Sequence, residues 1–241
     1  MFWDNLPAGY YDKIVKDGLS KNKGFQSYWH HITFMKLKNY VKKDSKVLDF
    51  ACGPGTFFNY LDNKYSTGYD ISSKQIQYAK NVYGSVNKTF TSDFEDLEKN
   101  NKYDFITING LVEYLDEIEF HNLLNSLKSR IKKNGEILIT TPNYKMSMKF
   151  IEKLSHLINL NDYSEIQKSL YTKKKFIELL QHHEKNFELL EIKHFLNFFS
   201  FISFFSIKLA YKIDSIFEKI TNNKFGFLLL VRIRIKNLNE N

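Results

Sequence analysis

The chain has a single cysteine, Cys52, among 241 residues, and only three prolines and ten glycines. One cysteine excludes an internal disulfide framework and a zinc site built from cysteines. So few prolines and glycines exclude collagen-like and Pro/Gly-rich chains. No apolar run reaches the roughly 18 residues of a membrane span, and the first residues lack the basic-then-apolar layout of a secretory signal. We therefore expect a globular cytoplasmic protein.

Charge and aromatic side chains are spread unevenly along the chain. Residues 1–140 carry 19 basic and 17 acidic side chains, whereas residues 141–241 carry 16 and 10. Nine of the 22 phenylalanines lie between Phe195 and Phe227. A basic, Phe-rich second half suits an anionic membrane surface, a nucleic acid or an acidic substrate. An AT-rich genome, whose codons favour Lys, Asn, Phe, Ile and Tyr, accounts for the same composition.

Short apolar runs alternate with helical patterns through the first 141 residues. The helices predicted between these runs are Ser72–Val82, capped by Ser72 or Ser73, and Asp116–Ile131, with Gly135 as its stop. Apolar residues recur at helical spacing in the second of them, at Ile118, Leu123, Leu124, Leu127 and Ile131. The predicted strands are Lys46–Ala51, Ser66–Asp70, Lys88–Ser92, Tyr103–Asn109 and Gly135–Thr141. Such alternation predicts an α/β fold, a parallel sheet with helices on both faces.

The regular alternation of strands and helices changes after Thr141. The patterns there predict helices over 143–160, 172–183 and 197–221, and strands over 187–195 and 226–235. Because no repeat or Pro/Ser-rich linker interrupts the chain, we expect one domain over 1–241. Its parts are an N-terminal helical cap (1–43), a core (44–142), a helical insertion (143–171) and a C-terminal part (172–241) that includes a Phe-rich helix.

The sharpest motif is a turn of small residues after the first strand, Val47–Phe57 (VLDFACGPGTF). Glycine lets the backbone take a positive φ, or lets a ligand approach where a Cβ would stand. The second strand ends in Asp70, 21 residues after Asp49, where a carboxylate can accept hydrogen bonds from a ribose diol. Because ligands bind at the carboxyl ends of parallel strands, the turn predicts a nucleotide-like site. A helix is expected to begin just after Gly55.

This turn resembles motif I of the class I S-adenosylmethionine-dependent methyltransferases. The resemblance covers roughly Lys46–Thr141, with weaker support from the last two predicted strands as a terminal antiparallel hairpin. It implies a Rossmann-like sheet of seven mostly parallel strands, with S-adenosyl-L-methionine as the cofactor. Glycine usually begins the turn in that family, whereas this chain has Ala51.

The resemblance also implies a role for each motif. Asp70 would hold the ribose hydroxyls, Ile71 would lie against the adenine, and Asp93 with Phe94 would meet the adenine amino group. Asn109 and Gly110 would face the methionine end. The residues implied to bind the cofactor at the turn itself are Asp49, Ala51, Cys52, Gly53 and Gly55.

Simpler interpretations stand beside these roles. Asp49 and Asp70 could each cap a following helix, and Asp93 could belong to a solvated acidic patch. Cys52 is a small packing residue unless its pKa is depressed. A nicotinamide-dependent dehydrogenase is disfavoured, because its fingerprint needs a third glycine where this chain has Phe58.

The candidate catalytic residues are His30 and His31 in the N-terminal cap, and Glu113 and Tyr114 after the fourth strand. A sulfonium methyl group is already activated, so positioning matters most, but a hydroxyl acceptor gains from a general base. Each of these side chains could instead serve packing or lie on the surface. No set of Asp and Asn at the metal-site positions of such enzymes is evident, so we expect no metal dependence.

The Phe-rich segment carries an apolar stripe at helical spacing, with Lys208, Lys212 and Lys219 on another face. One interpretation is a helix between the last two strands, packed on the sheet by its stripe. The other is an amphipathic cap over 195–220 that lines an acceptor pocket or contacts anionic lipid. Nucleic acid is disfavoured, because the basic residues are dispersed. The stripe consists of Phe198, Ile202, Phe205, Leu209, Ile213, Ile216 and Ile220.

Together these features predict a methyltransferase for a small or lipid-linked acceptor, with O-methylation ahead of C- or N-methylation. The alternative is a non-catalytic binding or scaffold protein of the same fold, associated with a membrane. Patterning alone gives no oligomeric state.

Overall fold

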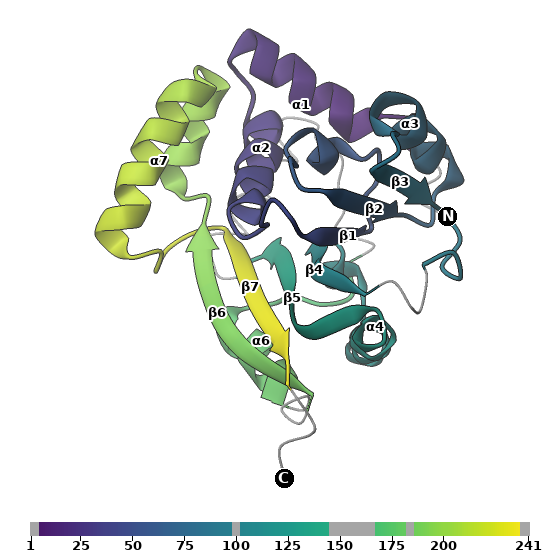
Figure 1. The fold of residues 1–241 in the computed structure, drawn as a ribbon. Helices are drawn as coiled ribbons and strands as arrows, with labels where there is room; N and C mark the ends of the chain where they lie inside the picture. The colour runs from purple at the N-terminus through teal and green to yellow at the C-terminus, as the bar shows by residue number, and fades with distance from the viewer. Residues whose placement is uncertain (1–4, 98–101, 145–166, 182–185, 237–241) are drawn as a thin grey trace.

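The computed structural model describes residues 5–97, 102–144, 167–181 and 186–236. Its centre is a seven-stranded sheet with the strand order β3-β2-β1-β4-β5-β7-β6, in which β7 runs antiparallel to both neighbours (Figure 1). This confirms the predicted fold class, terminal antiparallel hairpin included. The strands are β1 (Lys46–Phe50), β2 (Tyr65–Tyr69), β3 (Lys88–Thr91), β4 (Tyr103–Asn109), β5 (Ile131–Pro142), β6 (Phe187–Phe195) and β7 (Leu228–Ile235).

Helices cover both faces of the sheet, so its central strands are buried on both sides, as the unbroken apolar runs require. On one face, α4 (Glu117–Lys128) and α6 (Lys173–Gln181) pack against Leu48 and Ile106. On the other face, α2 (Phe25–Lys38) packs against Val47 and Phe105. The edge carrying β3 is covered by α3 (Ser73–Tyr83).

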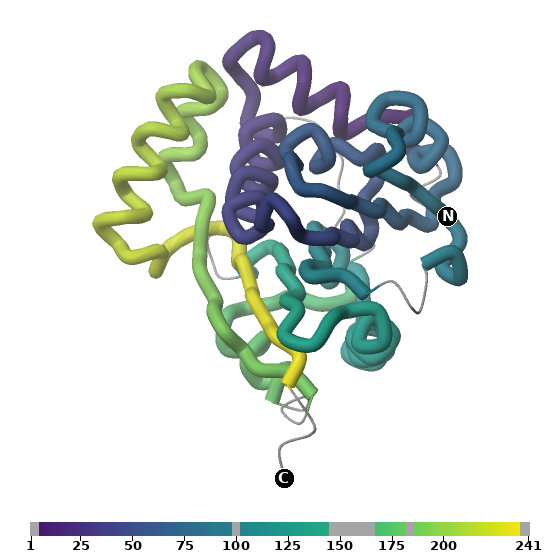
Figure 2. Tube along the Cα trace, viewed as in Figure 1, coloured from purple at the N-terminus to yellow at the C-terminus, as the bar shows by residue number. Residues whose placement is uncertain are grey.

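The first of the N-terminal helices crosses the top of the molecule, whereas α2 runs downward through its centre (Figure 2). The first helix, α1 (Tyr10–Lys21), lies along α3, because Asp12 accepts hydrogen bonds from Tyr78 and Tyr83. Helix α2 contacts η5, a 3₁₀ helix over Phe198–Phe204. Within the described residues, no helix is both long and apolar enough to cross a bilayer.

The helix predicted to begin just after Gly55 is a short 3₁₀ helix, η2 (Thr56–Asn59). Two local expectations are wrong. Helix α4 begins at the capping box of Asp116 and Glu119 and ends at Lys128, and Ile131 already belongs to β5. Ile118, expected on the buried face, is exposed. The helix predicted over 143–160 falls almost wholly outside the described residues.

The Phe-rich segment is not one helix. It breaks between η5 and α7 (Ile207–Thr221), where the Ser206 hydroxyl accepts a hydrogen bond from the Leu209 N–H. The interpretation that its apolar stripe packs on the sheet is also wrong. The buried side chains of α7 are Ile207, Ala210, Asp214 and Glu218, while most of the predicted stripe faces solvent.

The physical reason is a buried polar contact between α7 and α2. Asp214 accepts hydrogen bonds from the Tyr28 hydroxyl at 2.8 Å and the Ser200 hydroxyl at 2.6 Å. Glu218 forms an ion pair with Lys36 of α2. Since buried acids are costly without partners, these contacts decide which face of α7 points inward.

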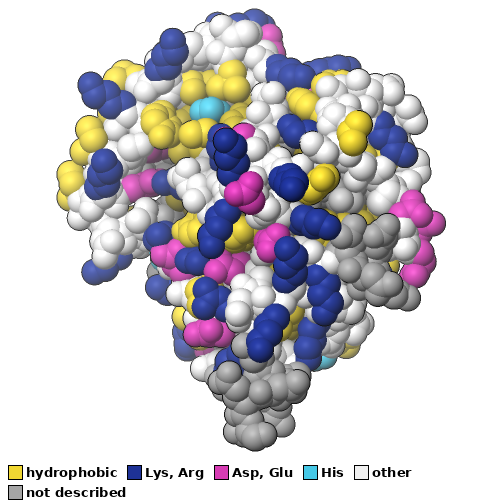
Figure 3. All heavy atoms as spheres, in the orientation of Figure 1, with side chains coloured by type: hydrophobic (Ala, Val, Ile, Leu, Met, Phe, Trp, Pro, Cys, Tyr) yellow, Lys and Arg dark blue, Asp and Glu magenta, His cyan; other side chains and the backbone are white. Residues whose placement is uncertain are grey.

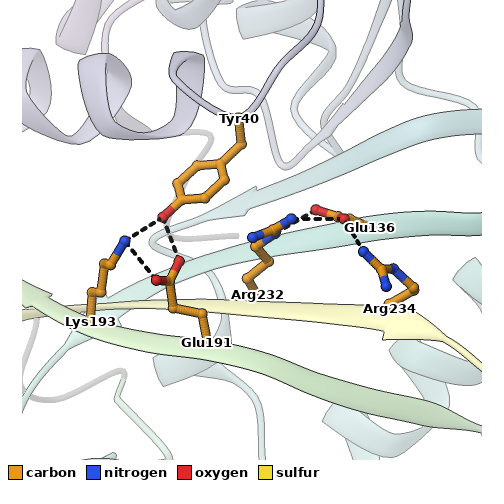
Figure 4. A network of polar contacts seen from close by, with 6 residues as sticks. All are labelled: Tyr40, Glu136, Glu191, Lys193, Arg232 and Arg234. Atoms are coloured by element: carbon orange, nitrogen blue, oxygen red, sulfur yellow. Dashed lines mark hydrogen bonds and ion pairs between the residues drawn. The ribbon is translucent and has the colours of Figure 1, made fainter.

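The antiparallel strands carry a second polar network (Figure 4). Glu136 of β5 accepts hydrogen bonds from Arg232 and Arg234 of β7. Tyr40, which follows α2, donates to Glu191 of β6 at 2.7 Å. These contacts tie the residues just before the core to the antiparallel hairpin.

Candidate active site

The glycine turn after β1 has the positive φ angles that its glycines allow. Ala51, Gly53 and Gly55 all have positive φ, at 63°, 51° and 75°. A Cβ added to Gly53 would meet no atom within 4 Å, so this backbone faces open space. A Cβ on Gly55 would lie 2.9 Å from the ring of Phe90 and 3.0 Å from the Cβ of Ala79. Only Gly53 therefore leaves room for a ligand, and Gly55 is needed for packing.

Asp70 joins the ends of β1 and β2. One carboxylate oxygen accepts a hydrogen bond from the Gly53 N–H at 2.8 Å, and the other accepts from the Ser72 N–H at 2.9 Å. The second contact goes to Ser72, the N-cap residue of α3, so Asp70 closes the turn before that helix and does not stand at its N-cap. Ser72 makes no side-chain cap bond. A carboxylate offers about four acceptor positions, and these two N–H groups take two of them.

The residues predicted near adenine line the same edge. Ile71 is 48% exposed directly beside Asp70. Phe94 is half-buried against Phe50 and Tyr69, and the Arg130 guanidinium lies 4.0 Å from its ring centre. Asp93 is exposed and accepts a hydrogen bond from the Glu95 N–H at 2.9 Å.

Asp49 and Cys52 are buried behind the turn. The Thr107 hydroxyl of β4 donates to Asp49 at 2.6 Å, so Asp49 ties two strands together and does not cap a helix. Burial raises the pKa of Asp49 to about 7. Burial also raises the pKa of Cys52 well above its usual value, and a protonated thiol is no nucleophile.

At the end of β4 the chain turns through Gly110, which has a φ of +61°. Glu113, in the 3₁₀ helix η3 (Val112–Tyr114), is buried there, and the Thr141 hydroxyl donates to it at 3.2 Å. Burial raises the pKa of Glu113 to about 7. Its Oε1 lies 3.7 Å from the position that a Cβ of Gly110 would take. Asn109 accepts a hydrogen bond from Thr140, and Tyr114 is half-buried.

The two candidate histidines lie on α2. The ring of His30 is 5.1 Å from the ring of Tyr11, and desolvation lowers the pKa of His30 to about 4. His31 Nδ1 lies 2.9 Å from the Tyr60 hydroxyl, and burial lowers the pKa of His31 as well. Both are neutral at pH 7, and both are weaker bases than an ordinary histidine.

One contact was missed by sequence reasoning. The Gln75 side chain accepts a hydrogen bond from the Gly9 N–H at 3.0 Å and donates to the Pro7 carbonyl at 3.1 Å. Gln75 lies in the first turn of α3, so these bonds hold the segment before α1 against the start of that helix. A lone glutamine on a helix gives no sequence signal for such a role.

Among the residues that the structure describes, no three His, Cys, Asp or Glu side chains are grouped as metal ligands.

Known proteins share this architecture. The structure of a SAM dependent methyltransferase from Archaeoglobus fulgidus has 20% identity and a TM-score of 0.58, over 86% of this chain and 94% of that one. The N-methyltransferase NodS from Bradyrhizobium japonicum, in complex with S-adenosyl-L-homocysteine, has 13% identity and a TM-score of 0.56, over 90% of each chain. The magnesium protoporphyrin IX methyltransferase from Synechocystis has 13% identity and a TM-score of 0.52, over 88% of this chain and 83% of that one.

These identities support the fold, and a sequence model supports the family. No curated protein matches the chain. The model of a family described as a methyltransferase domain matches residues 26–192, from α2 into β6. This span contains every predicted site residue. The chain therefore belongs to the methyltransferase domain family, with the fold of the class I S-adenosylmethionine-dependent methyltransferases.

Proposed function

We propose that this chain transfers a methyl group from S-adenosyl-L-methionine to a small or lipid-linked acceptor, with a hydroxyl oxygen as the favoured attacking atom. One observation carries the proposal. Gly53 donates to Asp70 where β1 and β2 end, and the space beside Gly53 is open. Bare backbone next to a carboxylate at this edge suits the ribose of a nucleoside.

The residues present fit the cofactor. Asp70 would accept hydrogen bonds from the ribose hydroxyls, and the exposed Ile71 would cover one face of the adenine. Asp93 and Phe94 would border the adenine amino group. When bound, the cofactor supplies a methyl group activated by a sulfonium whose leaving group is a neutral thioether.

The acceptor side would be formed at the end of β4. Asn109 and Gly110 would face the methionine end, and Tyr114 would orient the acceptor. Holding the acceptor in line with the S–CH3 bond and excluding water is the main contribution of the protein, roughly 7–11 kcal/mol in well-oriented reactions.

Glu113 is the favoured general base. Its pKa of about 7 makes it a stronger base than an ordinary carboxylate, and it is half ionised near neutral pH. As the bond from the acceptor oxygen to the methyl carbon forms and the S–CH3 bond breaks, the hydroxyl proton would pass to Glu113. His30 and His31, with lowered pKa values, are the weaker candidates.

C- or N-methylation is the alternative reaction. An amine acceptor would also lose a proton to a base, so Glu113 would serve either chemistry. NodS, which shares the fold, is an N-methyltransferase. Mass analysis of the methylated product would identify the attacking atom.

Calorimetry with S-adenosyl-L-methionine and S-adenosyl-L-homocysteine tests the cofactor site. We expect Asp70→Ala to weaken binding of both by about 10- to 100-fold, with Asp70→Asn between Asp70→Ala and the wild type, because the amide retains one acceptor oxygen. Asp62→Ala, an exposed carboxylate outside the site, is the control. Unchanged affinity of Asp70→Ala would refute the ribose assignment.

An extract screen with isotopically labelled methyl donor tests turnover. A labelled product formed by the wild type and lost in Glu113→Gln supports the methyltransferase with Glu113 as base. Cofactor binding without any labelled product, from extracts that include a lipid fraction, would favour the scaffold alternative.

A further inference from the structure

The segment between β6 and β7 exposes an apolar surface that no described part of the chain covers. We call it the outer apolar face. Its members include Phe205 at 87% exposure, Ile220 at 78% and Phe198 at 66%. A contiguous exposed patch of large apolar side chains marks an interaction surface. The face consists of Phe198, Phe199, Phe204, Phe205, Leu209, Ile216 and Ile220.

Exposed lysines border the outer apolar face, whereas the acidic side chains of the same segment are buried. Lys208, Lys212 and Lys219 of α7 are exposed. At 3.6 residues per turn they follow one side of the helix, next to the line of Leu209, Ile216 and Ile220. The acidic residues between 198 and 225 are Asp214 and Glu218, which are 1% and 4% exposed and are held by α2. The exposed charge here is therefore entirely positive.

This arrangement inverts the usual surface helix. A helix on a globular protein normally buries its apolar stripe and exposes its polar one. In α7, two of the four buried side chains are the carboxylates of Asp214 and Glu218. The large apolar side chains of Leu209, Ile216 and Ile220 are exposed. Figure 3 shows hydrophobic and basic side chains side by side along the edge of the molecule that α7 forms, at the left of the view.

We propose that the outer apolar face docks the protein on a membrane surface that contains anionic lipid. Apolar side chains flanked by lysines suit the boundary between acyl chains and anionic headgroups. A second copy of the chain is a poorer partner. In a two-fold dimer the patch would meet itself and bring lysines against lysines.

The docking face is joined to the N-terminal cap. Phe25, which begins α2, stacks on Phe201 and Phe204 with ring centres 4.9 Å and 5.6 Å apart. The N–H groups of Gly24 and Ile207 donate to Ser203 and Asn22 across the same junction. Membrane contact would thus hold the cap close to the bilayer. This inference goes beyond the proposed methyl transfer and does not depend on it.

Vesicle co-sedimentation of the full chain tests the proposal. We expect binding to phosphatidylcholine vesicles that contain 30–40% phosphatidylglycerol, at least tenfold stronger than to phosphatidylcholine alone and decreasing with salt. The double variant Phe205→Ser/Ile220→Ser and the double variant Lys208→Glu/Lys212→Glu should each lose at least tenfold of that binding. All four side chains are exposed, so the variants should fold.

Matched controls change equally exposed residues elsewhere. Val86→Ser removes an exposed apolar side chain between α3 and β3, and Lys42→Glu/Lys43→Glu reverses two exposed lysines after α2. Both should bind vesicles like the wild type. Absence of binding to anionic vesicles at low salt, or equal binding by the face variants, would overturn the proposal. So would a dimer, seen by sedimentation equilibrium, that Phe205→Ser/Ile220→Ser dissociates. Calorimetry with the cofactor on the same samples reports separately on the methyltransferase site.

Discussion

Acidic side chains are buried in two regions of the molecule, but their surroundings differ. One region is the edge where β1, β2 and β4 end, and the other is the inner face of α7. At the edge, Asp49 and Glu113 accept hydrogen bonds from threonine hydroxyls, and burial raises the pKa of each to about 7. On α7, Asp214 accepts from Tyr28 and Ser200, and Glu218 pairs with Lys36. Burial of an acid alone therefore does not mark a site. Glu113 differs from the acids of α7 in its surroundings, because its Oε1 lies 3.7 Å from the position that a Cβ of the exposed Gly110 would take.

Gly53 and Gly55 test the same difference between open backbone and packed backbone, and Gly55 gives the largest expected loss of stability. Gly55→Ala should destabilise the fold by about 2–5 kcal/mol, because positive φ strains alanine and the new Cβ meets Phe90 and Ala79. Gly53→Ala should cost only about 1–2 kcal/mol of stability, from the backbone alone. Its main effect should be weaker cofactor binding. Urea unfolding and calorimetry on both variants separate the two roles, and equal stability losses would contradict them.

The contact between α2 and α7 is tested by Asp214→Ala. The change leaves the buried hydroxyls of Tyr28 and Ser200 without their carboxylate, and we expect a loss of about 3 kcal/mol in the free energy of unfolding. Asp17→Ala breaks an exposed pair with Lys21 and should cost less than about 1 kcal/mol. A loss for Asp214→Ala as small as that of the control would mean that this contact does not decide the orientation of α7.

The buried acid Glu113 of the candidate active site should show in the pH dependence of stability. The pKa of Glu113 is raised to about 7, so the folded state holds a proton that the unfolded state releases, and this stabilisation is lost as pH rises through 7. Glu113→Gln does not titrate. Its free energy of unfolding relative to the wild type should therefore increase by about 2–3 kcal/mol between pH 5 and pH 8. The exposed Glu117→Gln should show no such trend, and a flat difference for Glu113→Gln would argue against a raised pKa.

The smallest expected effect concerns the first residue of the turn. Ala51 has a φ of 63°, a conformation that strains an L-residue. Ala51→Gly should stabilise the protein by about 0.5–1 kcal/mol, since relief of strain outweighs the extra freedom of glycine in the unfolded chain. Thermal unfolding measures the gain. A loss of stability would show that the alanine methyl group contributes packing that outweighs the strain.

Patterns that depend on neighbours in sequence were predictable. The strands from Lys46 to Thr141 follow from short apolar runs, and the positive φ at Gly53 follows from the glycine turn. Patterns that depend on distant partners were not. Three features depend on contacts that spacing does not reveal. They are the short 3₁₀ form of the helix after Gly55, the link between Gln75 and Gly9, and the exposure of Ile118.

The amino-acid sequence by itself determined the alternating fold, the glycine turn and the acid at the tip of the second strand. These are local features, set by apolar period and by the few residues that tolerate a positive φ. Only the tertiary structure decided that Gly55 is packed against other side chains while Gly53 faces open space. It also decided that burial raises the pKa of Glu113 to about 7. Finally, it decided that α7 buries its acidic side chains and exposes the outer apolar face. These features depend on burial and on hydrogen-bond partners, because the free energy of burying a charge or leaving a cavity depends on the surrounding residues.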